Sequence, residues 1–321
     1  MSAIEFDGLS KSYGGVTAVE ELSLSVEEGE VFGFLGPNGA GKSTTINAML
    51  DFTTPTSGAV RVFGHDAQRE SLAIRRRAGL LLEGYGAYPE LTGREHVEHA
   101  IETKGADDDP DTLLRRVGLD TEAADRRAGT YSKGMRQRMA IAVALVGEPD
   151  LLVLDEPSTG LDPNGARALR EIVREESARG ATVFFSSHIL EQVEAVADRI
   201  GILLDGRLSA VGEVGALRDD LGTGTTVEIR VSGVPDGLLD RLRSIAGVRE
   251  VEAGEETLSV VCHGGEAKLR ALEVAADAGV YRDFHLRETS LQDVFSAYTE
   301  AGADPRGDGD SVEASAGAGE A

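Results

Sequence analysis

Gly36-Pro37-Asn38-Gly39-Ala40-Gly41-Lys42-Ser43-Thr44 is the stretch of this 321-residue chain that decides its fold. It follows an apolar run at residues 31–35 and precedes a helix-compatible segment at residues 46–50. This order of strand, glycine-rich loop and helix is typical of a phosphate-binding loop, because glycines let backbone N–H groups turn inward and a helix start is partially positive. We therefore predict that all residues of the stretch surround the phosphates of a nucleoside triphosphate.

Two side chains of the loop have more specific predicted roles. Lys42 is expected to act in catalysis by reaching the β- and γ-phosphates, and the Ser43 hydroxyl is expected to ligate Mg²⁺. The alternative is a glycine-rich turn that binds no ligand. The lysine, the hydroxyl and the preceding strand together argue against that alternative.

A pair of carboxylates follows a second apolar run. Leu151–Leu154 is fully apolar, as expected of a buried parallel strand, and it ends in Asp155-Glu156. Acids at the carboxyl end of such a strand lie at the sheet edge where the phosphate loop is also expected. Asp155 is predicted to hold Mg²⁺, directly or through water, and Glu156 to polarise the attacking water as general base.

Charge is the unusual feature of the composition. The chain has 32 Lys and Arg against 56 Asp and Glu, a net charge of −24. Because nucleic acids and anionic lipids attract basic surfaces, this balance predicts no nucleic-acid partner. The acids are spread along the whole chain, which disfavours a single functional acidic patch. We predict a halophilic protein, since concentrated salt screens the self-repulsion of an acid-rich surface.

Other features of the composition favour the cytoplasm. No stretch approaches the roughly 18 apolar residues of a membrane span, and the first residues lack the basic and then apolar segments of a secretory leader. The single cysteine, Cys262, excludes a disulfide within the chain and is expected to be a small buried residue on a strand.

The first 222 residues are predicted to form one α/β domain. Strand-like segments at Val183–Ser186 and Ile200–Leu204 alternate with helical patterns, which indicates a mainly parallel sheet with a P-loop. The stretch from residue 71 to about residue 127 is expected to be helical with polar breaks.

A second domain and a tail are predicted after a boundary at residues 222–224. Residues 223–300 show the segment order βαββαβ, which predicts a small ferredoxin-like α+β domain, with a final helix at Leu291–Tyr298. Residues 301–321 are rich in Gly, Ala, Ser, Asp and Glu and are predicted to be a disordered acidic tail.

A third motif is Tyr131-Ser132-Lys133-Gly134-Met135-Arg136-Gln137-Arg138, in which Ser132 suits a helix N-cap. Because it lies upstream of Asp155, the chain resembles the ATP-binding subunits of ABC transporters, whose signature reads Leu-Ser-Gly-Gly-Gln in this place. The resemblance covers roughly residues 3–220. It implies an ABC-type nucleotide-binding domain with ATP and Mg²⁺ as cofactors.

The resemblance also implies roles for residues outside these motifs. Tyr13 matches the aromatic residue that stacks on adenine in the family, although a turn tyrosine is the alternative. His188 matches the switch histidine that contacts the γ-phosphate and holds the transition state. The loop Ser158–Asp162 resembles the one that crosses the dimer interface. In the implied homodimer, Ser132 and Gly134 of one copy contact the nucleotide held by the other copy, and hydrolysis reopens the dimer.

The chain departs from the family pattern at two places. Lys133 and Met135 replace the first Gly and the Gln of the signature, and Lys133 is expected either to add positive charge there or to lie in solvent. Glu83 stands where the family usually has Gln. It is expected to contact the nucleotide and approach Mg²⁺, and its added charge is expected to slow hydrolysis.

The resemblance further implies a separate transmembrane permease, contacted near residues 85–97, which would hold the chain at the cytoplasmic face of the membrane. The ending Ser290–Phe295 resembles multidrug and sodium-exporter-like subunits of the export-type (ABC-2) class. Two alternatives stay open: a soluble ABC ATPase with a non-transport partner, and a switch that binds ATP with negligible hydrolysis.

Overall fold

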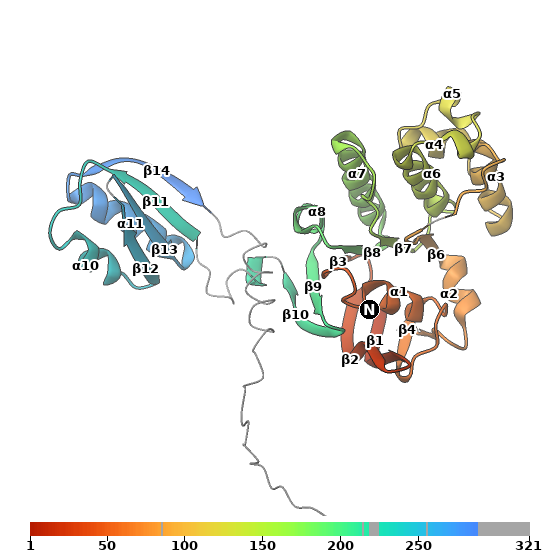
Figure 1. The fold of residues 1–321 in the computed structure, drawn as a ribbon, viewed down its shortest axis with the longest axis horizontal. Coiled ribbons are helices and arrows are strands. Elements are labelled where there is room, and N and C mark those ends of the chain that lie inside the picture. Colours follow the sequence, from red (N-terminus) through yellow and green to blue (C-terminus); the bar gives the residue numbers. More distant parts are fainter. Residues whose placement is uncertain (85, 214, 218–224, 255, 288–321) are drawn as a thin grey trace, which may run out of the picture.

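The computed structural model describes residues 1–84, 86–213, 215–217, 225–254 and 256–287. A six-stranded sheet with the order β10-β9-β3-β8-β7-β6 is the centre of the first region (Figure 1). Five of its strands run parallel, and β10 pairs antiparallel with β9 at one edge. The strands are β3 (Val31–Leu35), β6 (Ala78–Leu81), β7 (Leu151–Asp155), β8 (Thr182–Ser187), β9 (Arg199–Leu204) and β10 (Arg207–Glu213).

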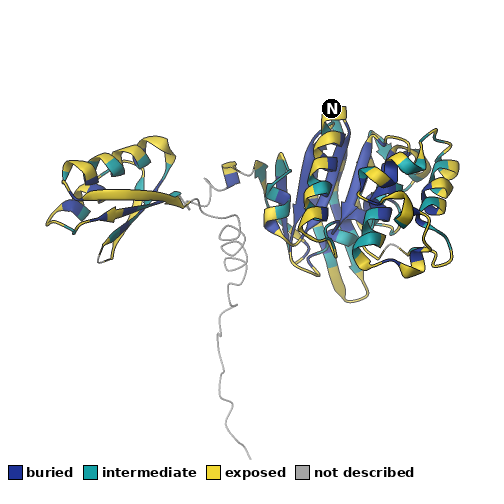
Figure 2. Cartoon of the chain, turned by 90° about the horizontal axis from the view of Figure 1, so that it is seen from above, coloured by how far each residue is buried: buried dark blue, intermediate teal, exposed yellow. Residues whose placement is uncertain are grey.

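The central strands are apolar because both of their faces are covered. Every residue of β3, β7 and β8 is buried (Figure 2). Alternate residues of β7 pack into two different hydrophobic clusters: Leu152 and Leu154 into one, Leu151 and Val153 into the other. This is the pattern expected of a parallel sheet between two layers, and it confirms the predicted mainly parallel sheet.

One face of this sheet is covered by a second sheet and by α1. The second sheet has the order β2-β1-β4-β5 and is antiparallel throughout. It is formed by β1 (Ser2–Tyr13), β2 (Val16–Glu27), β4 (Ser57–Val62) and β5 (His65–Asp66). The other face packs against helices. The helices of this region are α1 (Lys42–Met49), α2 (Ser71–Arg77), α3 (Gly93–Lys104), α4 (Pro110–Arg116), α5 (Thr121–Ala124), α6 (Lys133–Leu145), α7 (Pro163–Arg179), α8 (Leu190–Glu194) and the 3₁₀ turn η1 (Ala128–Thr130).

The expectation that residues 71–127 are helical with polar breaks is wrong at one point. Strand β6 lies within this stretch and pairs with β7 through four residue pairs. It is short, and no polar residue alternates along it, so its period does not distinguish it from a helix. Tertiary pairing decides its conformation.

Residues 225–287 form a separate set of elements with the predicted order βαββαβ. Their sheet has the order β12-β13-β11-β14 with all pairs antiparallel. Their side chains form a hydrophobic cluster of their own, which contains the buried Cys262. The elements are β11 (Thr225–Val231), α10 (Leu238–Arg243), β12 (Val248–Ala253), β13 (Thr257–Cys262), α11 (Gly264–Asp277) and β14 (Tyr281–Arg287). The predicted boundary at 222–224, the helix at 291–298 and the tail at 301–321 lie outside the described residues.

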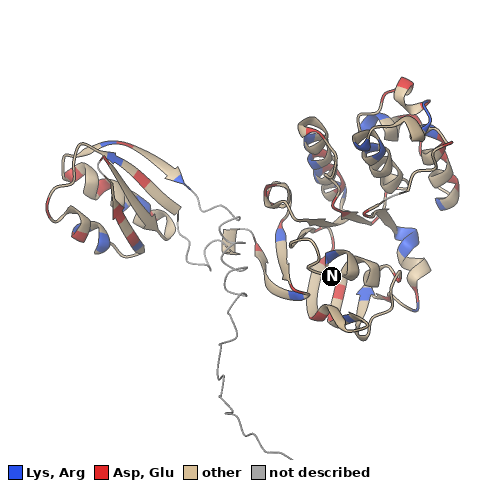
Figure 3. Ribbon diagram, in the orientation of Figure 1, with Lys and Arg blue, Asp and Glu red and all other residues tan. Residues whose placement is uncertain are grey.

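Charged side chains are distributed over the elements of both regions (Figure 3). Within the described ranges, no helix is both long and apolar enough to cross a bilayer.

Candidate functional site

The loop between β3 and α1 is held tightly against the sheet. The Gly36 N–H donates to the Ser187 carbonyl oxygen at 3.3 Å. A Cβ on Gly36 would lie 2.4 Å from the Leu203 carbonyl oxygen, and a Cβ on Gly41 would lie 2.3 Å from the Ala18 carbonyl oxygen. Gly41 also has φ +106°. Only glycine fits these two positions. The close approach of the Leu203 and Ala18 backbone therefore requires these glycines, independently of any ligand.

Lys42 begins α1 and is buried, with 6% of its surface exposed. Its ammonium donates to the carbonyl oxygens of Gly36 at 2.7 Å and Pro37 at 3.2 Å. It also lies 3.2 Å from Glu156 Oε1. A buried ammonium requires such partners, and here they hold the charge inside the curled loop.

Parallel pairing of β7 with β8 brings the acids beside a histidine. Asp155 ends β7 and accepts a hydrogen bond from the Ser186 hydroxyl, and it pairs with Ser186 in register. Glu156 has φ +49° and its N–H donates to the Ser186 carbonyl oxygen at 3.2 Å. His188 Nδ1 lies 2.8 Å from Glu156 Oε2. A left-handed backbone at a non-glycine residue is uncommon, and here it turns the Glu156 carboxylate toward Lys42 and His188.

One oxygen of this arrangement lacks a hydrogen bond. Glu156 Oε1 is buried and accepts no hydrogen bond of acceptable geometry, although Lys42 Nζ is 3.2 Å away. An unsatisfied buried oxygen is costly, and it is the kind of group that a bound ligand or water completes.

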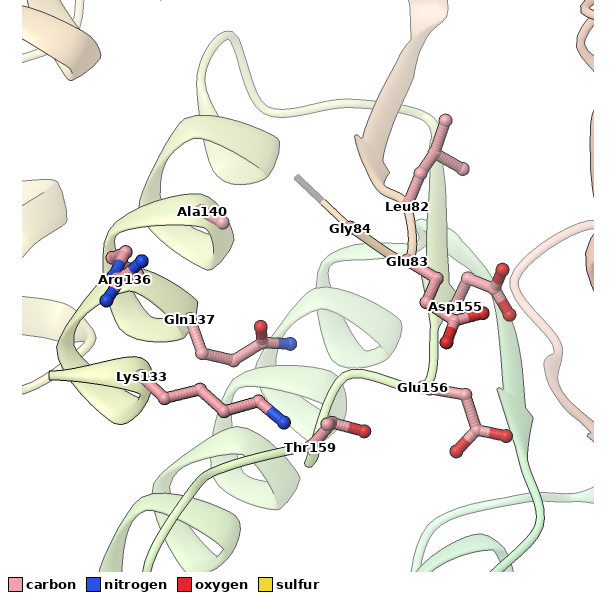
Figure 4. Close-up of a pocket in the computed structure, with 10 residues that line it drawn as sticks. All are labelled: Leu82, Glu83, Gly84, Lys133, Arg136, Gln137, Ala140, Asp155, Glu156 and Thr159. Carbon is pink, nitrogen blue, oxygen red and sulfur yellow. The ribbon is translucent and has the colours of Figure 1, made fainter. Parts of the chain in front are cut away.

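Two pockets adjoin at these residues, since Glu83 and Glu156 line both of them. The first, of about 340 Å³, lies along the loop; its lining residues are Ala18, Asn38, Gly39, Gly41, Lys42, Ser43, Thr44, Glu83 and Glu156. The second, of about 510 Å³, lies between Asp155, Glu156 and α6 (Figure 4). The structure thus brings the phosphate loop, both acids and Glu83 to one place.

The site fits a hard divalent cation in its donor chemistry. The Ser43 hydroxyl and the carboxylates of Glu83 and Glu156 line the loop pocket, and oxygen ligands of this kind suit Mg²⁺. No group of three or more His, Cys, Asp and Glu side chains among the described residues forms a ready protein-only metal site. Such a site would suit a cation that is held mainly by phosphate oxygens and water.

Comparison with known proteins agrees with this geometry. The family model "ABC transporter" matches residues 19–159. The daunorubicin/doxorubicin resistance ATP-binding protein DrrA of Streptomyces peucetius is 38% identical over 97% of this chain and 96% of its own length. The linearmycin resistance ATP-binding protein LnrL of Bacillus subtilis is 34% identical over 90% of this chain and 93% of its own length.

The chain belongs to the ATP-binding subunits of ABC transporters. It is an ABC ATPase that binds and hydrolyses ATP, and its fold is the P-loop ABC fold. A solved dimeric ATP-binding cassette in a post-hydrolysis state, bound to ADP and Pi, has 26% sequence identity and a TM-score of 0.62 over 66% of this chain and 98% of that chain.

The signature residues of this ABC subunit lie at the start of α6. Ser132 is its N-cap, and the Ser132 hydroxyl accepts from the Met135 N–H at 3.2 Å. Gly134 packs against the loop Ser158–Asp162, because a Cβ on Gly134 would lie 2.9 Å from the Gly160 carbonyl oxygen. Neither Ser132 nor Gly134 belongs to the lining of the loop pocket in the same copy.

The loop Ser158–Asp162 leads into α7, for which Asp162 is the N-cap. Asp162 accepts from the Gly165 N–H at 3.0 Å and from Arg138 Nη2 at 2.9 Å. These contacts, first the backbone N–H of Gly165 and then Arg138, lower the pKa of the Asp162 carboxyl. The loop is therefore tied to α6 through Arg138.

Tyr13 lies at the end of β1, and half of its surface is exposed. Its hydroxyl lies 3.4 Å from Thr53 Oγ1, and Lys11 Nζ lies 4.8 Å from its ring centroid. It is not among the residues that line the loop pocket. The Tyr13 ring is therefore accessible from solvent at the end of β1.

Sequence reasoning missed two residues that organise the site. Ser186 is fully buried and contacts both Asp155 and the backbone of Glu156. Gln137 lines the second pocket and donates to the Pro157 carbonyl oxygen at 2.7 Å. A signal for Ser186 was available, since a serine inside an apolar strand must find a hydrogen-bond partner.

Proposed function

We propose that this ATPase drives a separate export-type permease through closure of a homodimer, with ATP held between the two copies. The contact of Glu156 with both Lys42 and His188 carries the assignment of the site. It joins the phosphate loop, the general base and the switch histidine in one copy. The position of Ser132 at a helix start, away from the loop pocket of its own copy, supports its action on the nucleotide of a second copy.

The residues that bind Mg-ATP within one copy divide into three groups in this proposal. The loop from Gly36 to Thr44 cups the triphosphate, with Lys42 on the β- and γ-phosphates. Ser43, Asp155 and Glu83 would hold Mg²⁺, which would neutralise charge on the phosphates. Tyr13 stacks on the adenine.

Catalysis belongs to Glu156 and His188. Glu156 accepts a proton from the attacking water, and His188 orients the Glu156 carboxylate and contacts the γ-phosphate. The start of α6 of the other copy, with Ser132 and Gly134, aims its partial positive charge at the same phosphate. Hydrolysis removes that attraction and lets the dimer open.

The proposal places the chain at the cytoplasmic face of the membrane. Export is supported by the resistance proteins that resemble the chain over almost their whole length. The segment around Tyr88 and α3 is the proposed contact with the permease. Tyr88 is exposed by 64%, and its N–H donates to His96 Nε2 at 2.9 Å, which orders the entry to α3.

Glu156→Gln tests the catalytic assignment. The amide cannot accept the proton of water, so turnover should fall by roughly 10²-fold or more while ATP affinity is kept. In size-exclusion chromatography with light scattering, the variant should become a stable dimer on addition of Mg-ATP. Glu98→Gln, an exposed site on α3, is the matched control. Unchanged turnover in Glu156→Gln would remove Glu156 from the role of general base.

Co-purification tests the partner. The tagged chain, extracted from its native membranes in mild detergent, should bring down a multi-span permease, and Tyr88→Ala should weaken that association. A tagged chain found only with soluble partners would instead favour the alternative of a soluble ABC ATPase.

The acidic surface supports adaptation to concentrated salt. The net charge of −24 should destabilise the fold at low ionic strength through self-repulsion. Thermal unfolding followed against KCl concentration should show Tm rising toward molar salt. A Tm that is independent of KCl would contradict this proposal.

A further inference from the structure

Strand β14 forms one edge of the sheet in the second region, residues 225–287 (Figure 1). Residues that pair directly across an antiparallel ladder point to the same face of the sheet. Phe284 pairs with Ile229, which is fully buried in the core. Leu286 pairs with Val227, which is fully buried as well. Phe284 and Leu286 therefore lie on the face of the sheet that contains the core.

This part of the core face is nevertheless open to solvent. The exposed fractions are 42% for Phe284, 45% for Leu286 and 39% for Tyr281, and we call these three residues the β14 patch. Helix α10 packs on β12, and α11 packs mainly on β11 and β13. Among the described residues, the two helices thus leave β14 largely uncovered, and Figure 2 shows the strand exposed along its length.

The opposite face of β14 is polar. Asp283, His285 and Arg287 point to that side, where they pair with polar residues of β11. An antiparallel sheet with one polar face needs a cover on its other face only. Within the described part of the second region, the β14 patch is therefore the portion of the core face that a further apolar surface would complete.

The sequence directly after β14 has the pattern of such a cover. An apolar stripe with the spacing i, i+3, i+4 and i+7 would lie on one side of a helix over residues 291–298. Three residues, 288–290, connect this segment to the end of β14. The members of the stripe are Leu291, Val294, Phe295 and Tyr298.

The spacing of the stripe matches the spacing of the patch. Four residues of a helix advance by about 6 Å, and two residues of an antiparallel strand advance by about 7 Å. A helix that runs back along β14 would place Leu291 over Leu286 and Phe295 over Phe284. The short connection also gives this segment a much higher effective concentration at the patch than a separate molecule has.

We propose that residues 291–298 pack on the β14 patch of the same copy and complete the core of the second region. Burial of apolar surface stabilises this contact. An apolar edge strand that stays open favours association with other molecules, and the proposed contact prevents this. The inference does not depend on nucleotide binding or on the permease, so it can fail while the proposed function holds.

Cross-linking of introduced cysteines in the full chain tests this arrangement. The single native cysteine, Cys262, is buried, so a short bis-maleimide should react selectively with introduced thiols. Phe284→Cys combined with Phe295→Cys should cross-link within one molecule, which denaturing gel electrophoresis detects as a change in mobility. His285→Cys combined with Phe295→Cys is the matched control. Because residue 285 points to the opposite face, this cross-link should be lost.

Two charge variants test the same contact without introduced cysteines. Phe295→Asp places a charge in the stripe and should speed hydrogen exchange at residues 281–287, measured by mass spectrometry, because β14 loses its cover. Ser296→Asp adds the same charge on the other side of the segment and should leave this exchange as in wild type.

Three results would overturn the inference. The first is equal cross-linking of the two double-cysteine variants, and the second is equal exchange at residues 281–287 in Phe295→Asp and wild type. The third is a cross-link that forms only between molecules, which would assign the β14 patch to contact with a second copy.

Discussion

Residues 1–213 and residues 225–287 differ in what they bury. The first region encloses charged groups, among them Lys42, Asp155 and Glu156, whereas the buried core of the described second region contains no charged side chain. Burying a charge costs several kcal/mol unless it is paired. Folding the first region therefore carries a free-energy cost of burying charge that folding the second region does not. This cost indicates that the catalytic site lies in the first region.

The buried charges of the first region are themselves of two kinds. Glu30 is satisfied by Arg199 at 2.9 Å and by the Glu27 N–H at 2.7 Å. Glu176 is satisfied by Arg116 at 2.8 Å and Arg179 at 2.7 Å. Glu156, in contrast, keeps one oxygen without a hydrogen bond. Buried carboxylates with a partner for both oxygens, such as Glu30 and Glu176, stabilise the fold. The buried carboxylate that lacks a hydrogen bond at one oxygen, Glu156, is the one to which a ligand would add a hydrogen bond.

Removal of the buried ammonium should have the largest effect. Lys42→Ala should lower ATP turnover by about 10³-fold, because it deletes the cation that stabilises charge on the transferred phosphoryl group. Steady-state phosphate release measures this. Lys268→Ala, in the second region, should leave turnover unchanged; a loss of similar size there would break the distinction between the two regions.

A cavity in the apolar core should affect stability without affecting the site. Ile229 is fully buried on β11 and pairs with Leu258 and Phe284. Ile229→Ala should cost about 3 kcal/mol of unfolding free energy, measured by urea denaturation. The residues that line both pockets lie outside residues 225–287, so the affinity for Mg²⁺-AMP-PNP, a non-hydrolysable ATP analogue, should persist. Loss of binding in a folded variant would mean that the second region contributes to the site.

Substitution of Glu176, a buried acid with two arginine partners, should lower stability without a direct effect on the ATP site. Glu176→Gln should destabilise the chain by about 2 kcal/mol, because it weakens two ion pairs and leaves two guanidiniums partly unpaired. Glu175→Gln is the matched control: Glu175 is exposed and contacts the same Arg116 at 2.8 Å, so its loss should cost well under 1 kcal/mol. Equal denaturation midpoints for the two variants would contradict the distinction between satisfied and exposed acids.

The smallest effect is expected at the start of α7. The pKa of Asp162 is lowered in the folded state, so its charged form adds stability above the ordinary Asp range near pH 4 and loses it as pH falls through the folded value. Asp162→Asn keeps a capping oxygen but removes this dependence. Thermal unfolding of the nucleotide-free chain should show the variant slightly less stable at pH 7, with a difference from wild type that shrinks as the pH falls below the ordinary Asp range. A difference in Tm between variant and wild type that does not change with pH would show that the Asp162 charge does not contribute to stability.

The sequence predicts the centre of the first region well, because each motif carries its own chemistry. The loop at 36–44 fixes strand, turn and helix together, and the acids at 155 and 156 mark the end of a strand. Strand β6 was missed because four apolar residues have no period that separates strand from helix.

Contacts between side chains of distant segments could not be predicted from the sequence. The sharing of Glu156 between Lys42 and His188 depends on the positive φ of Glu156 and on the register of β7 with β8. That Glu83 and Lys133 both line the second pocket depends on how α6 packs beside β6. Local patterns do not encode such register and packing.

The most direct test is a structure of the Glu156→Gln variant crystallised with Mg-ATP. We expect two copies with the triphosphate against residues 36–44 of one copy and Ser132 of the other beside the γ-phosphate. Nucleotide bound away from Lys42, or a saturated complex that stays monomeric with Ser132 in solvent, would contradict the proposed site.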